Sequence, residues 1–162
     1  MIERSTEVTI TVNGEVVTQR VEARQHLVDF LREELQLTGS HVGCEHGVCG
    51  ACTVRVEGQI VRGCLMLAAQ ADGLRVETIE GLAESGEIAD LQAAFLERNA
   101  LQCGYCTPGM LLTAAELLAT RPCPSRAEIR AYLSGNYCRC TGYQAIVDAI
   151  AAVAARRQGR LT

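Results

Sequence analysis

The sequence predicts an α+β protein with two parts: a small roll of strands and one helix over residues 1–79, and an antiparallel four-helix bundle over residues 80–162. Three observations support this prediction. Apolar residues mostly alternate with polar ones in the first half, as is typical of strands. In the second half they recur at helical spacing. Most of the nine cysteines lie in short segments between the expected elements.

The first half opens with a predicted hairpin. Apolar and polar residues alternate over 8–12 and again over 17–21, on either side of Asn13–Gly14, a pair that favours a two-residue hairpin turn. One apolar face then predicts a helix through Leu27, Phe30, Leu31 and Leu35. Further short strands are expected near residues 54–56, 60–61 and 74–78.

The first two helices of the second half are predicted on either side of a cysteine pair. Apolar spacing from Ile88 indicates a helix that ends at about Leu101. Thr107–Pro108 has the form of an N-cap followed by proline at the first helical position, so a second helix is expected from there to about Thr120.

The third and fourth helices are predicted by their capping and periodicity. Ser125 and Glu128 form a capping box, and Gly135 can end the helix that follows. The last helix runs through Ile146–Val153 and is expected to end in an exposed Arg156–Arg157 tail. Short connections between four helices favour an antiparallel bundle, in which alternate connections lie at the same end.

Composition narrows the class of protein and of partner. The chain is 48% hydrophobic, and no apolar run approaches the roughly 20 residues of a membrane span. Its formal net charge of −4 argues against nucleic acid or an anionic membrane as partner. No signal sequence opens the chain, so we expect a cytoplasmic protein, and thiols in that reducing compartment favour metal ligation over disulfides.

The first cysteine group is Cys44, Cys49 and Cys52, followed by Cys64. The first three have the C-x4-C-x2-C spacing of plant-type [2Fe–2S] sites, and Cys64 would be the distant fourth ligand. Glycines around them suit a loop whose backbone N–H groups must approach sulfur closely. A structural zinc loop is the alternative, although zinc ligands usually come as two close pairs.

The second group joins Cys103 and Cys106 with Cys138 and Cys140. The first pair lies between predicted helices one and two and the second between helices three and four, so the bundle brings four thiols to one end. Cys123 lies in the connection at the opposite end and is expected to be a free thiol. This spacing fits a second [2Fe–2S] cluster, but also zinc or, less well, a redox C-x-x-C pair.

Three segments resemble a known family: Gly43–Val54, Gln102–Met110 and Cys138–Tyr143. They are similar, in the same order, to the iron–sulfur module of the xanthine oxidase family of molybdenum hydroxylases. The resemblance covers nearly the whole chain. It implies a plant-ferredoxin-like β-grasp domain over 1–79 and a [2Fe–2S]-binding four-helix bundle over 80–162.

The resemblance also implies the function. The chain would be the electron-transfer subunit of an oxidoreductase, with no substrate-converting site of its own. Electrons would pass from a molybdenum–pterin dinucleotide cofactor on a large subunit, through the bundle cluster and then the ferredoxin-like cluster, toward FAD on a medium subunit. Gln102 and Cys140 would lie at the pterin edge.

The implied assembly is a heterotrimer, duplicated into a dimer of heterotrimers. The sequence leaves no stretch for flavin or molybdenum domains, which the resemblance therefore places on the other subunits. Two alternatives remain at this stage: a free-standing two-cluster carrier of the ferredoxin type, and a zinc-stabilised interaction module.

Overall fold

The described part of the chain, residues 5–159 in a computed structural model, begins as the predicted β-hairpin. Strand β1 (Ser5–Val12) pairs antiparallel with β2 (Glu15–Glu22), and the alternating Val8, Ile10 and Val12 are buried. Asn13 and Gly14 between them have φ angles of 50° and 89°. Two successive left-handed residues are what a type I′ hairpin turn requires.

Five strands form one mixed sheet in the order β2-β1-β5-β3-β4. Strand β5 (Arg75–Glu77) is parallel to β1 and antiparallel to β3 (Thr53–Val56), which pairs antiparallel with β4 (Gln59–Arg62). A short helix α1 (Leu27–Asp29) continues into a π-helical turn η1 (Phe30–Glu34), and a 3₁₀ turn η2 spans Ala68–Ala71. Their apolar residues share one buried core with the sheet.

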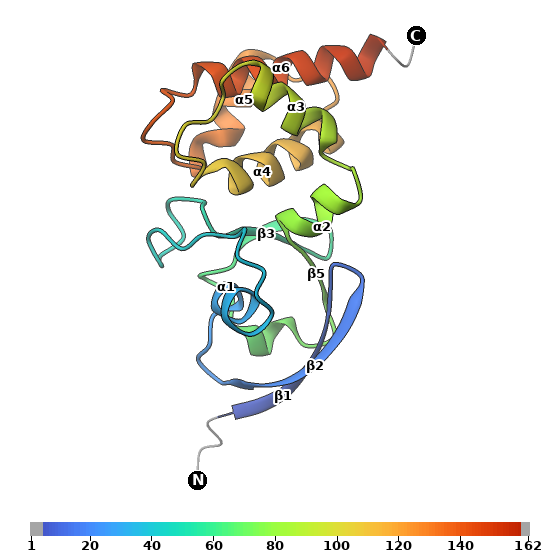
Figure 1. The fold of residues 1–162 in the computed structure, drawn as a ribbon, viewed down its shortest axis with the longest axis vertical. Coiled ribbons are helices and arrows are strands. Elements are labelled where there is room, and N and C mark those ends of the chain that lie inside the picture. Colours follow the sequence, from blue (N-terminus) through green and yellow to red (C-terminus); the bar gives the residue numbers. More distant parts are fainter. Residues whose placement is uncertain (1–4, 160–162) are drawn as a thin grey trace.

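The helical part lies above the sheet in Figure 1. Its elements are α2 (Ile79–Glu84), α3 (Ala89–Glu97), α4 (Thr107–Thr120), α5 (Arg126–Tyr132), the 3₁₀ turn η3 (Leu133–Gly135) and α6 (Gln144–Gly159). Helix α3 packs on α4 and α6, and α5 also packs on both. These helices share a second, separate core centred on the buried face of α4.

Several helix boundaries differ from the sequence prediction. Helix α2 was not expected, because with one buried residue, Leu82, it is too short to show periodicity. Helix α3 ends at Glu97 and not near Leu101, since Asn99 takes a left-handed conformation with φ 52° and ends the helix. The capping box of Ser125 and Glu128 is confirmed, with both reciprocal hydrogen bonds present.

Two predictions about single residues were wrong. The N-cap of α4 is Cys106, so Thr107 is already helical and its buried hydroxyl has no hydrogen-bond partner among the described residues. Arg157 does not belong to an exposed tail. Helix α6 continues past it, and its guanidinium makes two 2.8 Å hydrogen bonds to Asp90 at the start of α3.

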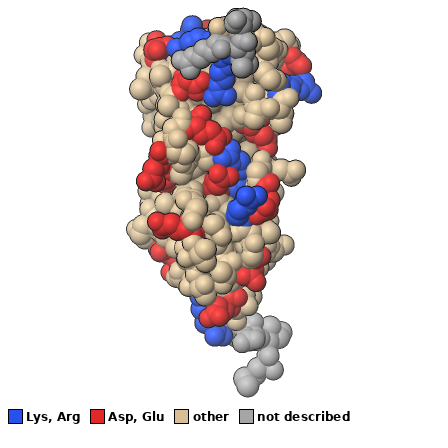
Figure 2. Space-filling view, turned by 90° about the vertical axis from the view of Figure 1, so that its right-hand side faces the viewer, with Lys and Arg blue, Asp and Glu red and all other residues tan. Residues whose placement is uncertain are grey.

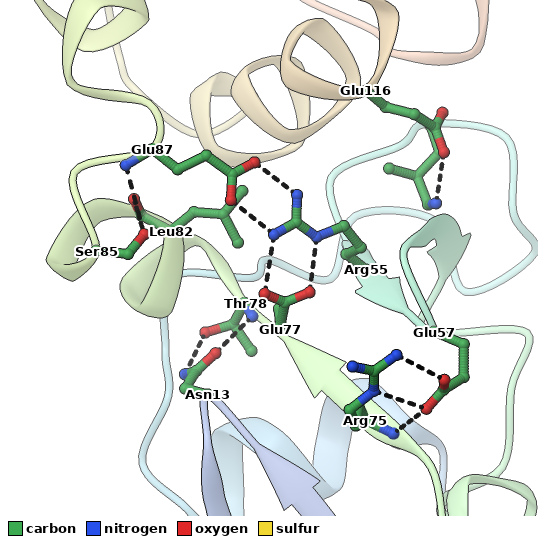
Figure 3. A network of polar contacts seen from close by, with 11 residues as sticks. Asn13, Arg55, Glu57, Arg75, Glu77, Thr78, Leu82, Ser85, Glu87 and Glu116 are labelled. Atoms are coloured by element: carbon green, nitrogen blue, oxygen red, sulfur yellow. Dashed lines mark hydrogen bonds and ion pairs between the residues drawn. The ribbon is translucent and has the colours of Figure 1, made fainter. Parts of the chain in front are cut away.

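Polar side chains join the sheet to the helices above it (Figure 3). Arg55 on β3 points between two carboxylates, with 2.8 Å from its Nε to Glu77 and 2.6 Å from its Nη1 to Glu87. A carboxylate oxygen of Glu116 on α4 accepts the Ile60 N–H at 2.8 Å. The two cores are therefore connected through a seam of directed hydrogen bonds.

The surface carries both signs of charge. On the face drawn in Figure 2, acidic and basic side chains are interspersed. Across residues 5–159, no helix is both long enough and apolar enough to cross a membrane.

Candidate metal centres

The first cysteine group lies on the loop before β3 and on the turn after β4. Cys52 and Cys64 are each only 2% exposed and pack against Val28, whereas Cys44 and Cys49 are half-buried. The loop turns tightly, because the backbone has positive φ at several positions, including Gly50 at 75°. This tight loop, which is buried only from Gly50 to Cys52, thus presents two thiols toward the core and two toward its rim.

Hydrogen bonds and burial shift the pKa values of thiols in this group in opposite directions. The backbone N–H groups of His46 and then Cys49 lower the pKa of Cys44 to about 6, and the Cys49 N–H lies 3.4 Å from Cys44 Sγ. Burial raises the pKa of Cys52 to about 12; the backbone N–H of Cys64 opposes this rise, and the Cys64 thiol adds to it. Backbone N–H groups directed at sulfur stabilise negative charge there, which is the state that metal ligation requires.

The second group lies where the helices approach the loop of the first. Cys103 and Cys106 occupy the α3–α4 connection, and Cys138 and Cys140 the connection from η3 to α6. The sulfurs of Cys103 and Cys140 are 3.6 Å apart, and both residues are exposed. Cys106 and Cys138 interact beneath them and are half-buried. The structure therefore brings together the four thiols that sequence spacing grouped.

Thr141 hydrogen-bonds the predicted cluster ligand Cys138, and the sequence analysis did not single it out. Its backbone N–H lies 3.4 Å and its hydroxyl 3.0 Å from Cys138 Sγ. Burial opposes ionisation of Cys138, but these hydrogen bonds outweigh it and lower the pKa. Tyr143 adds a hydroxyl that accepts the Cys138 N–H at 2.9 Å. Both residues fall within the Cys138–Tyr143 string, so a signal was present.

The remaining predicted residues, Gln102 and Cys123, and two histidines near the first cysteine group lie as follows. The Gln102 side chain is exposed, and its amide donates to the Cys140 carbonyl at 3.1 Å. Cys123 is exposed in the α4–α5 connection, beyond the far end of the helix that Cys106 caps. His46 contacts the Cys44 carbonyl through Nδ1, and His41 stacks on Tyr105 with ring centroids 4.5 Å apart.

The donor sets fit iron–sulfur clusters. Each group supplies four thiols, with N–H or O–H donors at Cys44 and Cys138, as hydrogen-bonded cluster ligands require. The unpaired buried hydroxyl of Thr107, next to Cys106, is a further donor available to sulfur. Among the residues described, no three His, Cys, Asp or Glu side chains converge to hold a single metal ion.

The two groups are in direct backbone contact. The carbonyl of Cys49, in the first group, accepts the N–H of Tyr137 at 2.8 Å, and Tyr137 immediately precedes Cys138 of the second. Both groups consequently lie on the same side of the molecule, at the left in Figure 1. One electron-transfer module with two adjacent centres is consistent with this arrangement.

Known proteins match both halves. A "2Fe-2S iron-sulfur cluster binding domain" family matches residues 10–81, and a "[2Fe-2S] binding domain" family matches residues 78–151. The chain is 52% identical to caffeine dehydrogenase subunit gamma of Pseudomonas sp. (strain CBB1), over 90% of this chain and 89% of that one. This chain belongs to the small iron–sulfur subunits of the xanthine oxidase family of molybdenum hydroxylases.

Further members of this iron–sulfur subunit family agree. The nicotine 6-hydroxylase small subunit of Paenarthrobacter nicotinovorans is 52% identical over 89% of this chain and 87% of its own. The crystal structure of quinoline 2-oxidoreductase from Pseudomonas putida 86 contains a chain with a TM-score of 0.90 and 48% identity, and the match covers 98% of both chains. Two [2Fe–2S] domains fit two clusters, so the family accounts for both cysteine groups.

Proposed function

We propose that this chain relays electrons within a multi-subunit molybdenum hydroxylase through two [2Fe–2S] clusters. The first would be held by Cys44, Cys49, Cys52 and Cys64, and the second by Cys103, Cys106, Cys138 and Cys140. The observation that carries the proposal is the backbone contact between two four-thiol groups in a chain of this family. When bound, each cluster supplies a one-electron acceptor and donor, and the protein sets its position, hydrogen bonds and exposure.

The direction of the relay that we propose is the one implied by the family resemblance, and the exposure of two sulfurs of the second group supports it. Cys103 and Cys140 are exposed, and the amide of Gln102 lies beside Cys140, where it could pair with a pterin edge. We assign this surface to a molybdenum–pterin dinucleotide cofactor on a large subunit. The first group would then pass electrons toward FAD on a medium subunit.

The two apolar cores support a division of the chain into two domains. We assign residues 1–79 to a β-grasp domain of the plant-ferredoxin type and 80–162 to a four-helix bundle, α2 being the lead-in to the bundle. Separate apolar cores below and above the Arg55 seam support this division.

The assembly we propose is a heterotrimer with large and medium subunits, duplicated into a dimer and located in the cytoplasm. The names of the relatives as gamma or small subunits support partner chains. Nine unpaired cysteines support a reducing compartment. A free-standing carrier is the competing function, and exposure of Cys140 beside Gln102 favours a fixed partner over it.

Native purification tests this proposal. The chain should co-purify with a molybdenum-bearing and a flavin-bearing subunit and contain about four irons, giving two distinct electron paramagnetic resonance (EPR) signals on reduction. A brown 17.4 kDa protein without either companion would establish the free carrier. A colourless, zinc-loaded protein would reject iron–sulfur function altogether. The intact complex can then be assayed with caffeine, nicotine and quinoline, the compounds named in its relatives.

A further inference from the structure

The segment that leads into Cys138 is clamped onto the first cysteine loop. Tyr137 donates its N–H to Cys49, as described above, and the Asn136 amide donates to the carbonyl of the next residue, Gly50, at 3.3 Å. On the other side of Asn136, the Gly135 carbonyl accepts from Arg62 at 2.8 Å. Three consecutive residues of the helical unit thus bind the sheet unit beside its cysteines.

Asn136 is the centre of this clamp. It is only 2% exposed, and its side-chain oxygen accepts from Arg62 at 3.3 Å. The Thr113 hydroxyl lies 3.1 Å from the same oxygen and shares its one proton with the Gly109 carbonyl, which lies 2.8 Å away. The Asn136 amide nitrogen is the donor to Gly50. A buried amide with both ends satisfied has one orientation, since any flip would leave buried groups unpaired. The side chain therefore holds Gly50, and with it the neighbouring Cys49 carbonyl, in a fixed place.

The packing around Asn136 leaves no room for a looser arrangement. A Cβ placed on Gly109 of α4 would lie 2.3 Å from the Gly50 carbonyl oxygen. One placed on Gly50 would lie 2.5 Å from the Gly135 oxygen. Backbones approach this closely only because both residues are glycine. The distance between the two cysteine groups is thus set by backbone contact.

A second contact also joins the two groups. Tyr105, between Cys103 and Cys106, stacks on His41 and donates its hydroxyl to the Val42 carbonyl at 2.7 Å. Tyr105 is 47% exposed, in contrast to the 2% of Asn136. This contact ends two residues before Cys44, whereas the Tyr137 contact ends on a cysteine itself. The Tyr137 contact is therefore the shorter covalent and hydrogen-bonded connection, and it is supported by the buried Asn136 although Tyr137 itself is 54% exposed.

We propose that Asn136 is a positioning residue for electron transfer between the clusters, because it holds the Cys49 carbonyl against the Tyr137 N–H. The inference rests on the proposed function. The route runs from Cys49 through one hydrogen bond into the Tyr137–Cys138 backbone. One electron leaves the reduced cluster and enters the oxidised one, so no bond is made or broken and no proton is transferred.

The test uses the full chain in its native complex. Asn136→Asp keeps the side-chain oxygen that accepts hydrogen bonds from Thr113 and Arg62. It replaces the amide N–H that donates to the Gly50 carbonyl with a second oxygen, which can only accept. We expect about four irons and both EPR signals to be retained. The rate of electron transfer between clusters after flash photoreduction should fall about tenfold, less than the roughly hundredfold that a 1 Å misplacement costs in catalysis. The spin–spin splitting between the two reduced clusters should weaken as well.

Matched variants separate positioning from folding. Thr113→Val removes the hydroxyl that orients Asn136 and should slow transfer in the same direction, by less. Tyr105→Phe removes the hydroxyl of the Tyr105 contact and should leave the rate unchanged. Redox titration of each cluster checks that midpoint potentials are unaltered, so that a slower rate reports geometry.

The outcomes distinguish the two proposals. Wild-type protein without two clusters overturns the proposed function itself. Two intact clusters with an unchanged rate and splitting in both Asn136→Asp and Thr113→Val overturn only the role of Asn136. A tenfold loss in Tyr105→Phe with no loss in Asn136→Asp would assign the route to the Tyr105 contact instead.

Discussion

The two cysteine groups differ in how the chain encloses them. In the first, Cys52 and Cys64 are buried and belong to a small apolar cluster with Val28, so the sulfurs are part of the core. In the second, Cys103 and Cys140 are exposed, and only Cys106 and Cys138 pack, half-buried, against the edge of the helical core. The first group lies inside its unit, and the second lies at the end of one.

Because of this difference in burial, we expect metal binding at the two sites to affect folding differently. Burial raises the pKa of both Cys52 and Cys106 to about 12, so the pKa does not separate the groups. Cys52 and Cys64, however, are themselves members of a buried apolar cluster, so binding a metal there is linked to folding of the sheet unit. The exposed pair at the helix ends can be changed without opening an apolar core. Exposure also leaves Cys140 free to meet a partner. We infer that the first site stabilises its unit and the second serves the interface.

The largest effects are expected from variants that each remove one cluster. Cys52→Ser should lose about half the iron and also destabilise the sheet unit, because the site and the core share this residue. Cys140→Ser should lose about half the iron while both cores stay folded. Iron analysis, EPR of each cluster and urea unfolding followed by circular dichroism measure both. Equal destabilisation by the two variants would remove the distinction drawn above.

Cys106→Ser is a stricter test of separate sites. This half-buried thiol starts α4, so its loss should strip the second cluster and leave a plant-type EPR signal from the first. Disappearance of both signals would mean that the two units do not hold their clusters independently.

The next effect concerns the contact between the units. Gly50→Ala should destabilise the chain by about 3 kcal/mol or more, since it combines a left-handed backbone with a Cβ too close to Gly135 and Asn136. Gly58→Ala is the matched control: φ is +82° and nothing lies within 4 Å of the added Cβ. It should cost only about 1 kcal/mol. Unfolding free energies from urea titration compare the two, and similar losses would show that the contact is loose.

The sequence predicted most of the features that depend on residues close together in the chain or on regular spacing. The hairpin at Asn13–Gly14, the capping box at Ser125 and the grouping of eight cysteines are all encoded within a few residues or by spacing. The opposite-end position of Cys123 followed from the order of the helices alone.

What sequence could not predict depends on contacts between distant segments. Asn136 is an ordinary polar residue after a glycine until Gly50, 86 residues away in sequence, lies beside its amide. The sequence predicted that Arg157 lies in an exposed tail, because its partner, Asp90, is at the start of another helix. Neither pairing has a periodic or spacing signal, since each arises from how two elements happen to meet.

A smaller effect tests the helical unit through the Asp90–Arg157 pair. The Arg157 hydrogen bonds lower the pKa of Asp90, so this carboxylate stabilises the fold above its unfolded pKa of about 3.9. That contribution is lost as pH falls through the still lower folded value. Asp90→Asn should cost about 1 kcal/mol at most, because both side chains are partly exposed.

The pH dependence sharpens this prediction. The difference between wild type and Asp90→Asn should stay constant from pH 8 to pH 5 in urea titrations, and shrink only at lower pH. Glu57→Gln removes the Arg75 pair of the sheet unit, which is more exposed than the Asp90–Arg157 pair, and should have a smaller effect. A difference for Asp90→Asn that vanishes by pH 6 would contradict the assigned cause.

The smallest expected effect is at Cys123, the cysteine outside both groups. It follows the end of α4, whereas Cys106 precedes its start, and a helix of 14 residues separates the two by about 20 Å. No sulfur that far from the second group can serve as a ligand there. Cys123→Ser should therefore leave iron content, both EPR signals and unfolding free energy unchanged. Loss of a cluster in this variant would mean that the thiols are grouped differently from the two sets on which the comparison is built.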